Sequence, residues 1–201
     1  MKKGLLVVIS GPSGAGKGSI YRQVIDRTGM KRSVSVTTRQ PRPGEVDGVD
    51  YYFRTEEQYQ QMIAAGEFLE TAAVYRNYYG TPKAPVFENL DNGYDVLFEV
   101  DVHGARSIKK QYPDAVEIFI MPPSFEELEN RLRGRGTESE SSLRTRLSSA
   151  MNELGKYERF DYIVFNDDLE EAVEKVIAII NAEKCKIKNN MSMINSLLGK
   201  K

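Results

Sequence analysis

The feature that most constrains the fold is an apolar run followed at once by a glycine-rich loop. Residues 5–9 read Leu-Leu-Val-Val-Ile, and residues 11–17 read Gly-Pro-Ser-Gly-Ala-Gly-Lys. A continuous β-branched run is typical of a strand buried on both faces of a parallel sheet. The loop matches G-x-x-x-x-G-K, in which backbone amides and a helix N-terminus surround a phosphate and the lysine reaches the β- and γ-phosphates. The sequence therefore predicts a nucleoside triphosphate site between this strand and a helix over 18–25.

The loop departs from the common pattern at its end. Many such loops carry a Ser or Thr directly after the lysine as a magnesium ligand, but this chain has Gly18 there and Ser19 one position later. We therefore expect Mg²⁺ to be held mainly by phosphates and water, because this ion gives up its water reluctantly. This Gly-Lys-Gly-Ser ending resembles the variant found among nucleoside monophosphate kinases. The predicted triphosphate-binding residues of the loop are Gly11, Pro12, Ser13, Gly14, Ala15, Gly16, Lys17, Gly18 and Ser19, and the loop alone does not say which reaction follows.

Further strands and helices alternate along the chain. Apolar runs at 96–100, 116–121 and 162–165 predict buried strands. Apolar stripes with helical spacing predict two helices, one with Leu143, Leu147, Ala150, Met151 and Leu154, the other spanning 169–180. Capping signals at Ser124, Thr137 and the pair Asp167-Asp168 predict helix starts. This alternation favours an α/β fold with a central parallel sheet flanked by helices.

Residues 33–82 interrupt that alternation. They contain a loop rich in Pro, Arg and Gly, short aromatic strands at 51–53 and 68–74, and a helix capped by Thr55 and Gln58. We expect this segment to form a small mixed α/β lobe inserted between elements of the core. The tail from Glu183 onward is richer in Lys and Asn. It carries one possible apolar helical face, made of Met191, Ile194, Leu197 and Leu198, and we expect it either to pack on a partner or to fray.

The composition excludes several classes. The chain has 201 residues, and 28 Lys and Arg against 29 Asp and Glu give a net charge of -1, so a general nucleic-acid binder or a binder of anionic membranes is not favoured. The single cysteine, Cys185, cannot form an internal disulfide and suits a reducing compartment. No apolar run approaches the roughly 20 residues that span a bilayer, and the run after Lys3 is too short for a secretory signal. We expect a cytoplasmic protein.

Two arginines three positions apart suggest a second phosphate site. Arg39 and Arg42 lie on a proline-stiffened loop, and the guanidinium fork holds a phosphate with two hydrogen bonds. Tyr51 and Tyr79 could donate to the same phosphate. A solvated basic loop is the competing interpretation of these residues taken alone.

Several motifs in order resemble the guanylate kinase family, from Leu5 to about Ala182. Besides the glycine loop, they are Ser-Val-Thr-Thr-Arg-Gln-Pro-Arg-Pro-Gly-Glu-Val-Asp-Gly-Val-Asp-Tyr at 35–51, Phe-Leu-Glu at 68–70, Asn-Tyr-Tyr-Gly-Thr at 77–81, Arg-Leu-Arg-Gly-Arg-Gly-Thr-Glu at 131–138 and Asn-Asp-Asp at 166–168. The resemblance implies a P-loop core at 1–32, 83–130 and 155–182, a GMP-binding lobe at 33–82, a mobile lid at 131–154 and a tail at 183–201.

The resemblance also implies roles for particular residues. Arg39, Arg42, Tyr51 and Tyr79 would hold the 5′-phosphate of GMP, and Ser35, Glu70 and Thr81 would face its base. Thr81 stands where many relatives have serine, but it keeps a hydroxyl. Glu99 and Asp101 end a predicted strand, where α/β folds place groups that face the ligand, and Asp101 would lie near the base and the reacting phosphates.

The resemblance implies that a further set of residues would contact ATP. Arg135 and Arg146 match the family's lid arginines, which would neutralise charge on the transferred group, while Asn166 and Asp167 lie where the family contacts adenine. Lys17, Arg39, Arg135, Arg146 and Asp101 are the predicted catalytic residues. The only histidine, His103, is expected to have a structural or surface role, because this phosphoryl transfer needs no histidine base.

The predicted function is transfer of the γ-phosphate of ATP to GMP, as part of purine nucleotide metabolism. Two alternatives stay open from the sequence. One is a non-catalytic guanylate-kinase-like module that binds a phosphopeptide, against which the intact glycine loop argues. The other is a kinase for a different nucleoside monophosphate, against which Glu70 argues. Whether the protein is a monomer or a homo-oligomer is left undecided by the sequence.

Overall fold

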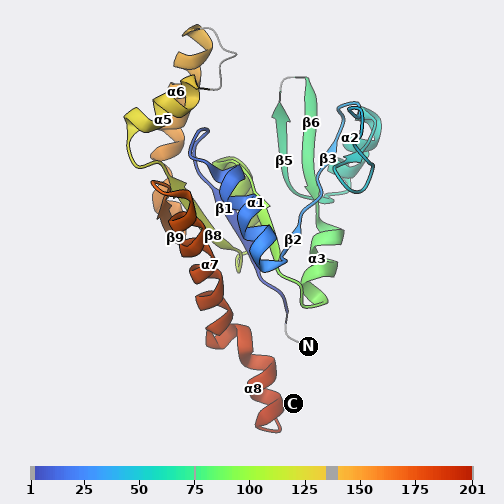
Figure 1. Ribbon diagram of the computed structural model, residues 1–201. Coiled ribbons are helices and arrows are strands. Elements are labelled where there is room, and N and C mark those ends of the chain that lie inside the picture. The colour runs from blue at the N-terminus through green and yellow to red at the C-terminus, as the bar shows by residue number, and fades with distance from the viewer. Residues whose placement is uncertain (1–2, 75, 135–139, 201) are drawn as a thin grey trace.

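The protein, a computed structural model that describes residues 3–74, 76–134 and 140–200, is built around a five-stranded parallel sheet (Figure 1). The strand order is β2-β7-β1-β8-β9. The bounds are β1 Leu6–Ser10, β2 Lys31–Arg32, β7 Val96–Glu99, β8 Val116–Met121 and β9 Tyr162–Phe165. The four apolar runs predicted as strands are all confirmed, whereas β2 has only two exposed residues and offered no pattern to find.

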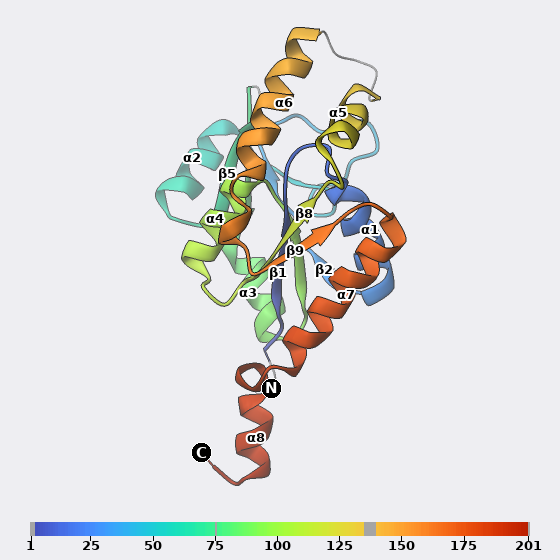
Figure 2. The ribbon, with the colours of Figure 1, turned by 90° about the vertical axis from the view of Figure 1, so that its left-hand side faces the viewer.

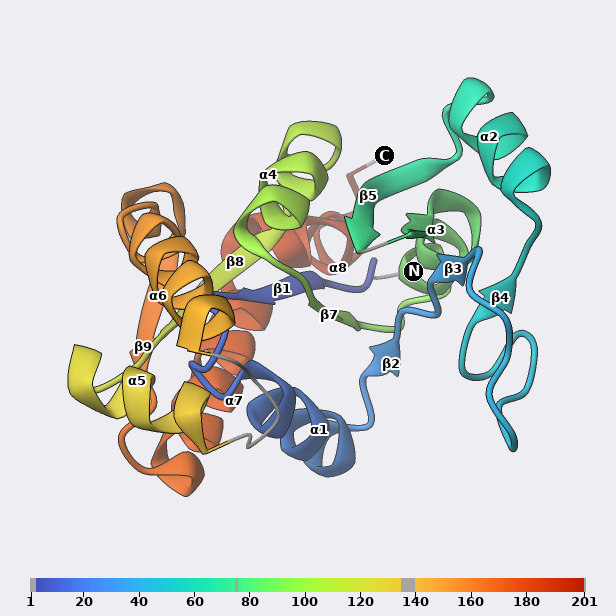
Figure 3. The same ribbon diagram turned by 90° about the horizontal axis from the view of Figure 1, so that it is seen from above.

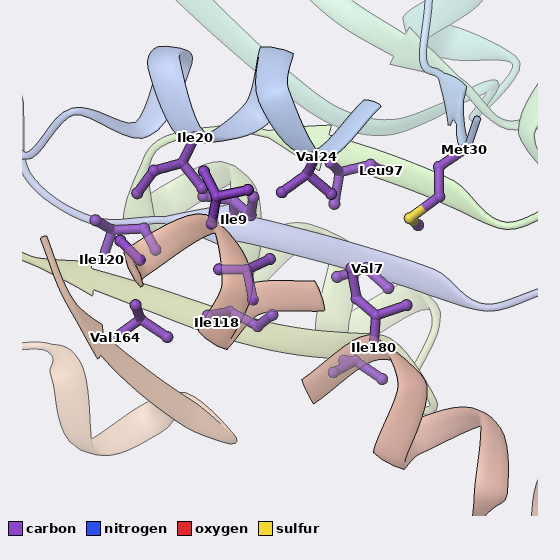
Figure 4. Close-up of a cluster of buried hydrophobic side chains, with 14 of the residues drawn as sticks. Val7, Ile9, Ile20, Val24, Met30, Leu97, Ile118, Ile120, Val164 and Ile180 are labelled. Atoms are coloured by element: carbon purple, nitrogen blue, oxygen red, sulfur yellow. The ribbon is translucent and has the colours of Figure 1, made fainter. Parts of the chain in front are cut away.

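Helices cover both faces of this sheet, which explains why β1 is buried along its whole length. On one face, α1 (Lys17–Thr28) and α7 (Leu169–Cys185) pack against Val7, Ile9 and Ile118 (Figure 4). On the other, α3 (Lys83–Asp91) and α4 (Val102–Gln111) pack against Leu6, Val8 and other side chains of that face. Figure 3 shows α4 on one side of β1 and α1 with α7 on the other. The predicted fold class is confirmed.

A second sheet lies within the segment predicted as an inserted lobe. Its order is β4-β3-β6-β5, with β3 antiparallel to β6 and β5 antiparallel to β6. Its elements are β3 Val36–Thr37, β4 Tyr52–Phe53, α2 Glu56–Ala64, β5 Phe68–Val74 and β6 Asn77–Pro82. Thr55 and Gln58 form the predicted capping box of α2. The small sheet buries a core of its own, around Tyr59 and Phe68.

Two helices, α5 and α6, lie on the side of the large sheet that is away from the small sheet (Figure 1). In α5 (Phe125–Arg133) and α6 (Glu140–Leu154), Leu128, Leu132, Leu143 and Ala150 are buried together. Ser124 caps α5 as predicted, by accepting from the backbone N–H of Glu127, while the predicted cap at Thr137 lies outside the described residues. The predicted place of Met151 on the buried stripe is wrong. Its side chain is 52% exposed, because Ala150 already fills the face of α6 that meets α5.

The chain ends in a helical tail beyond the sheet (Figure 2). Tyr157–Arg159 (η1) precedes β9, and Ile187–Asn190 (η2) and Met191–Leu197 (α8) follow α7, as the apolar spacing of the tail predicts. Asp168 is the cap of α7 and accepts from the backbone N–H of Glu171. Among the described residues, no helix is both long enough and apolar enough to cross a membrane.

The isoleucines of β8 and β9 test where the core lies. Ile118 is fully buried, whereas Ile163 on the neighbouring strand is 43% exposed. We predict that Ile118→Ala lowers the free energy of unfolding by about 2–5 kcal/mol, because the deletion leaves a cavity between β8 and the helices. Ile163→Ala should cost well under half of that. Urea denaturation of both variants makes the comparison, and equal losses would contradict the assigned core.

Candidate active site

The glycine loop connects β1 to α1 in a conformation that favours glycine. Gly14 and Gly16 have φ angles of 91° and 88°, in the left-handed region that L side chains adopt with strain. The ammonium of Lys17 lies along the loop and donates to the carbonyl oxygens of Gly11 at 2.6 Å and Pro12 at 2.9 Å. The helix α1 begins at Lys17, so its N-terminus, where a helix does not use all of its backbone amides, adjoins the loop, and the amide of Ser19 donates to the carbonyl oxygen of Gly16 at 3.1 Å. The predicted strand, loop and helix are thus all present, and they form an anion site.

A buried amide beyond β9 supports this loop. Asn166 is 5% exposed, and its Nδ2 donates to the carbonyl oxygen of Ala15 at 2.7 Å. A β-carbon at Gly16 would lie 2.2 Å from the same Nδ2, so only glycine allows the approach. Arg131 in turn donates to the backbone carbonyl of Asn166. Asp167 is exposed and makes no side-chain hydrogen bond within the part of the chain described. The two residues predicted to contact adenine therefore have different surroundings.

A cavity of about 380 Å³ opens beside the loop. It joins the loop to the carboxyl end of β7 and to α6, and its lining contains eight of the predicted residues together with two that the sequence analysis missed, Arg22 and Glu153. Arg22 lies one helical turn beyond Gly18 and could have been found from that spacing. Glu153 could not, because it reaches the cavity only through the packing of α6. The lining residues are Ser13, Gly14, Gly16, Lys17, Gly18, Ser19, Arg22, Glu99, Asp101 and Glu153.

The oxygen donors of this cavity suit a magnesium ion that keeps most of its water. A β-carbon at Gly18 would lie 3.4 Å from both carboxylate oxygens of Glu99, so this carboxylate lies directly over the position where other loops carry a hydroxyl. Asp101 and Ser19 add further oxygens. No group of three or more acidic, His or Cys side chains able to hold a metal exists among the described residues. The residues present therefore fit an ion held mainly by phosphates and water, with one or two carboxylates nearby.

One of the two arginines predicted to belong to a lid reaches the loop. Arg146 on α6 donates from Nη2 to Oγ of Ser13 at 3.0 Å, which brings its positive charge to the edge of the phosphate site. Arg135, its predicted partner in charge neutralisation, lies outside the described residues. His103 lies on another surface, where its Nε2 is 3.2 Å from Nζ of Lys156.

The predicted base-reading residues meet on β5, β6 and the segment before β3. Glu70 is only 8% exposed, and its Oε1 accepts a hydrogen bond of 2.7 Å from the hydroxyl of Thr81, its partner across the strands. Oγ of Ser35 lies 3.4 Å from the same hydroxyl. Burial raises the pKa of Glu70, and the negative charge of Asp101 acts in the same direction, whereas the Thr81 hydrogen bond opposes both. These residues form a buried polar group with a carboxyl at its centre.

The predicted phosphate-binding arginine Arg39 is held by a residue that the sequence analysis missed. Arg39 donates to Oε1 of Glu45 at 2.9 Å, and its guanidinium lies over the ring of Tyr51, 5.4 Å from the centroid. The rings of Tyr51 and Tyr79 meet edge to face at 6.0 Å. The Arg39 hydrogen bond lowers the pKa of Glu45. Arg42 is exposed, and its backbone N–H donates to the other carboxylate oxygen of Glu45 at 2.7 Å.

The buried group around Glu70 and the cavity beside the Lys17 loop adjoin at the start of α4. Asp101 caps this helix by accepting from the backbone N–H groups of His103 and Gly104, at 2.9 and 2.7 Å. A β-carbon at Gly104 would lie 3.5 Å from Oδ1 of Asp101 and 3.5 Å from Oε2 of Glu70. The two carboxylates therefore lie on either side of a helix position that has no side chain. A phosphoryl donor bound on the Lys17 loop and a phosphoryl acceptor bound against Glu70 would therefore lie next to each other.

Comparison with known proteins agrees with this arrangement. A family model described as guanylate kinase matches residues 3–183. The chain is 52% identical to a guanylate kinase of Caldanaerobacter subterraneus subsp. tengcongensis over 193 residues, which cover 96% of this chain and 94% of that one. It is 50% identical to that of Clostridium tetani, with 93% and 90% covered. A crystal structure of the guanylate kinase from Anaplasma phagocytophilum superposes with a TM-score of 0.75 at 33% identity, covering 96% and 94%.

The chain belongs to the guanylate kinase family. The family and the enzyme class predicted from the sequence are confirmed. Within this guanylate kinase family member, the roles of single site residues stay predictions.

The neighbouring residues Asn166 and Asp167 provide a matched test of the loop's support. Asn166→Ala leaves the carbonyl of Ala15 without its donor, so we predict a loss of about 1–3 kcal/mol in unfolding free energy and a higher KM for ATP. Asp167→Ala should change stability by less than about 0.5 kcal/mol. Thermal unfolding and ATP titrations at saturating GMP measure both effects. An Asn166→Ala variant with unchanged stability would show that the loop does not depend on this hydrogen bond.

Proposed function

We propose that this chain transfers the γ-phosphoryl group of ATP to GMP and releases ADP and GDP. The observation that carries the proposal is the position of the buried Glu70 carboxyl beside the cavity of the Lys17 loop, with Gly104 and Asp101 between them. The loop is suited to a nucleoside triphosphate, and a carboxylate is suited to one particular base edge. Membership of the guanylate kinase family supports the same reaction.

The acceptor site follows from the chemistry of guanine. Its N1–H and exocyclic N2 amine lie on one edge and are two donors that a single carboxylate accepts side by side. Glu70 would accept both, while the hydroxyls of Ser35 and Thr81 would bond O6. Arg39 and Arg42 would hold the 5′-phosphate with their guanidinium groups, and the hydroxyls of Tyr51 and Tyr79 would add donors. The hydrogen bond from Arg39 to Glu45 keeps the Arg39 guanidinium over the ring of Tyr51.

The donor site would use residues 11–19. The amides of the loop and the first turn of α1 would surround the β-phosphate, and Lys17 would exchange its carbonyl partners for the β- and γ-phosphate oxygens. Arg146 and Arg135 would neutralise charge on the transferred group. Asn166 and Asp167 would contact adenine. Asn166 would contact adenine while its side chain also donates to the carbonyl oxygen of Ala15 in the loop.

Phosphoryl transfer in this site needs positioning and positive charge rather than a strong base. An oxygen of the GMP phosphate attacks the γ-phosphorus in line with the departing ADP oxygen, and the attacking group is already an anion. Lys17 and the lid arginines stabilise charge that spreads over the equatorial oxygens. Glu99 and Asp101 lie where they would orient water around Mg²⁺. When bound, that ion would supply positive charge that offsets the negative charge of the triphosphate.

We assign a different role in the reaction to each part of the fold. The lobe at 33–82 would carry GMP, residues 131–154 would act as a lid over ATP, and the core at 1–32, 83–130 and 155–182 would hold the loop, leaving 183–201 as a tail. The near-neutral charge supports small nucleotides rather than nucleic acid or membrane as partners. The single cysteine supports a cytoplasmic setting, where the reaction would serve purine nucleotide metabolism.

A panel of acceptors tests this function. With ATP and Mg²⁺, we expect turnover with GMP to exceed that with AMP, UMP and CMP by orders of magnitude, with dGMP included to test the ribose. Comparable rates for a second base would indicate a kinase for another nucleoside monophosphate. No transfer to any acceptor by folded protein would indicate a binding module without catalysis.

Lys17 tests the donor site. We predict that Lys17→Met lowers kcat by about 10³-fold or more, because a neutral side chain cannot offset phosphate charge that has been removed from water. Lys175→Met on the exposed face of α7 is the matched control and should keep full activity. The measurement is a coupled assay of ADP release, after circular dichroism has confirmed a folded variant. Near wild-type turnover of Lys17→Met would exclude the loop as the donor site.

Glu70 tests recognition of the base. We predict that Glu70→Ala lowers kcat/KM for GMP by about 10²-fold or more, since charge-assisted hydrogen bonds of about 1.5–3 kcal/mol each are lost. The value for AMP should change far less, because adenine has an unprotonated N1 and no N2 amine for this carboxylate. Glu67→Ala, an exposed carboxylate in the same segment, is the control. If GMP and AMP rates fall together, Glu70 is structural and the base is read elsewhere.

A further inference from the structure

A second cavity lies away from the active site, on the α4 side of the large sheet. It has a volume of about 270 Å³ and shares no lining residue with the cavity of the Lys17 loop. Figure 2 shows α6 descending on this side of the sheet toward α4, and the segment after α6 completes the cavity wall. Its lining combines five basic side chains, one acid and two apolar residues: Arg106, Lys109, Lys110, Lys156, Arg159, Glu117, Val102 and Phe160.

The acid in this cavity is buried, and within the described residues one of its carboxylate oxygens has no hydrogen-bond partner. Glu117 lies on β8 and is 3% exposed, and its Oε1 makes no hydrogen bond among the described residues. No Lys or Arg nitrogen of the described chain lies within ion-pair distance of it. The pKa of Glu117 is raised to about 7, chiefly by burial, which the positive charge of Lys109 opposes and the negative charge of Asp161 assists. A buried polar group without a partner is destabilising and rare, so it requires an explanation.

The basic residues around Glu117 divide into two sets. Lys109 is occupied by the carbonyl of Ala115 at 2.6 Å and by Asp161 at 2.8 Å, and Lys156 by His103. In contrast, Arg106, Lys110 and Arg159 are exposed and have no ion pair in the described parts of the chain. The cavity therefore holds an unpaired acid inside and unpaired bases at its rim that do not neutralise one another.

Two apolar side chains, Val102 and Phe160, line the cavity. Phe160 is half-buried and meets Phe119 edge to face at 4.9 Å, which fixes its ring, and the buried Val102 lies beside it. An aromatic base stacks favourably on such a ring, and the stacking does not depend on which base it is. The cavity thus presents two apolar side chains, a single buried carboxyl and a cationic rim.

We propose that this cavity is a second nucleotide-binding site, for a nucleotide whose base carries an exocyclic amino group. The base lies against Phe160, its amino group donates to the carboxyl of Glu117, and the phosphates lie on Arg106, Lys110 and Arg159. The carboxyl of Glu117 and the exposed bases that line the cavity then gain partners of opposite polarity. Because α4 begins directly after Asp101, a nucleotide held here touches the helix that Asp101 caps in the active site.

Three probes separate base recognition from simple attraction of phosphate. CTP has the amino group, UTP has a carbonyl oxygen in its place, and tripolyphosphate has no base. The chain has no tryptophan, so Tyr157→Trp, on the exposed η1 turn beside the cavity, introduces a single local fluorophore. In this full-length background, we expect CTP to bind at least about tenfold more tightly than UTP or tripolyphosphate. Equal binding of tripolyphosphate, or no response to CTP, would overturn the proposal.

Variants assign the fluorescence response to this cavity. Lys110→Gln should weaken binding of CTP about tenfold, whereas Lys175→Gln, an exposed lysine on α7, should leave it unchanged. Lys17→Met should also leave it unchanged, because the loop belongs to the other cavity. If Lys17→Met removes the response while Lys110→Gln does not, the nucleotide binds in the active site and the proposal fails.

Glu117 itself is tested by two opposite effects. Glu117→Leu should abolish the preference for CTP over UTP and at the same time raise the Tm of the free protein, because it removes a buried carboxyl that has no partner. Glu117→Gln, which keeps the shape of the side chain, provides the same test if the leucine variant does not fold. A lower Tm in Glu117→Gln, with the CTP preference retained, would assign the carboxyl a structural role and overturn the proposal.

Discussion

The arrangement of the active site depends on one hydrogen bond between segments that are 151 positions apart. The side chain of Asn166, just beyond β9, donates to the carbonyl of Ala15 in the loop beyond β1. Such a bond forms because all strands of the large sheet are parallel, so their carboxyl ends lie along one edge. Gly16 has no side chain to block the Asn166 amide, and Lys17 donates a hydrogen bond to the carbonyl oxygen of Gly11 at the start of the loop. These contacts fix the conformation of the loop that we propose binds the triphosphate.

The second constraint is the placement of carboxylates around that loop. Glu99 lies over Gly18, and Asp101 lies across Gly104 from Glu70. Negative charge of this kind would repel a bare triphosphate. Lys17 and Arg22 line the same cavity, and Arg146 donates to Ser13 in its lining, so these cations have to balance it. Glu70 differs from the others, because burial raises its pKa and its hydrogen bond to Thr81 fixes its direction. A buried group of this kind favours the base that pairs with it and disfavours a base that leaves it unpaired.

The parts that could be predicted from sequence are those that local chemistry decides. The buried strands, the glycine loop and the caps at Ser124 and Thr55 each carry their own pattern, and the family follows from several motifs in order. Met151, Glu45 and Glu153 were misplaced or missed, because their surroundings arise from packing or pairing between segments rather than from neighbours in the chain. The cavity around Glu117 had no sequence pattern at all, since its lining comes from three separate elements.

The central claim is that guanine is read by Glu70 next to a triphosphate held by the Lys17 loop. A crystal structure of the full chain with GMP and a non-hydrolysable ATP analogue tests it most directly. The account predicts guanine N1 and N2 within about 2.7–3.2 Å of the Glu70 carboxylate, with the γ-phosphate against Lys17. A guanine ring turned away from Glu70, or a triphosphate bound outside the loop, would contradict it.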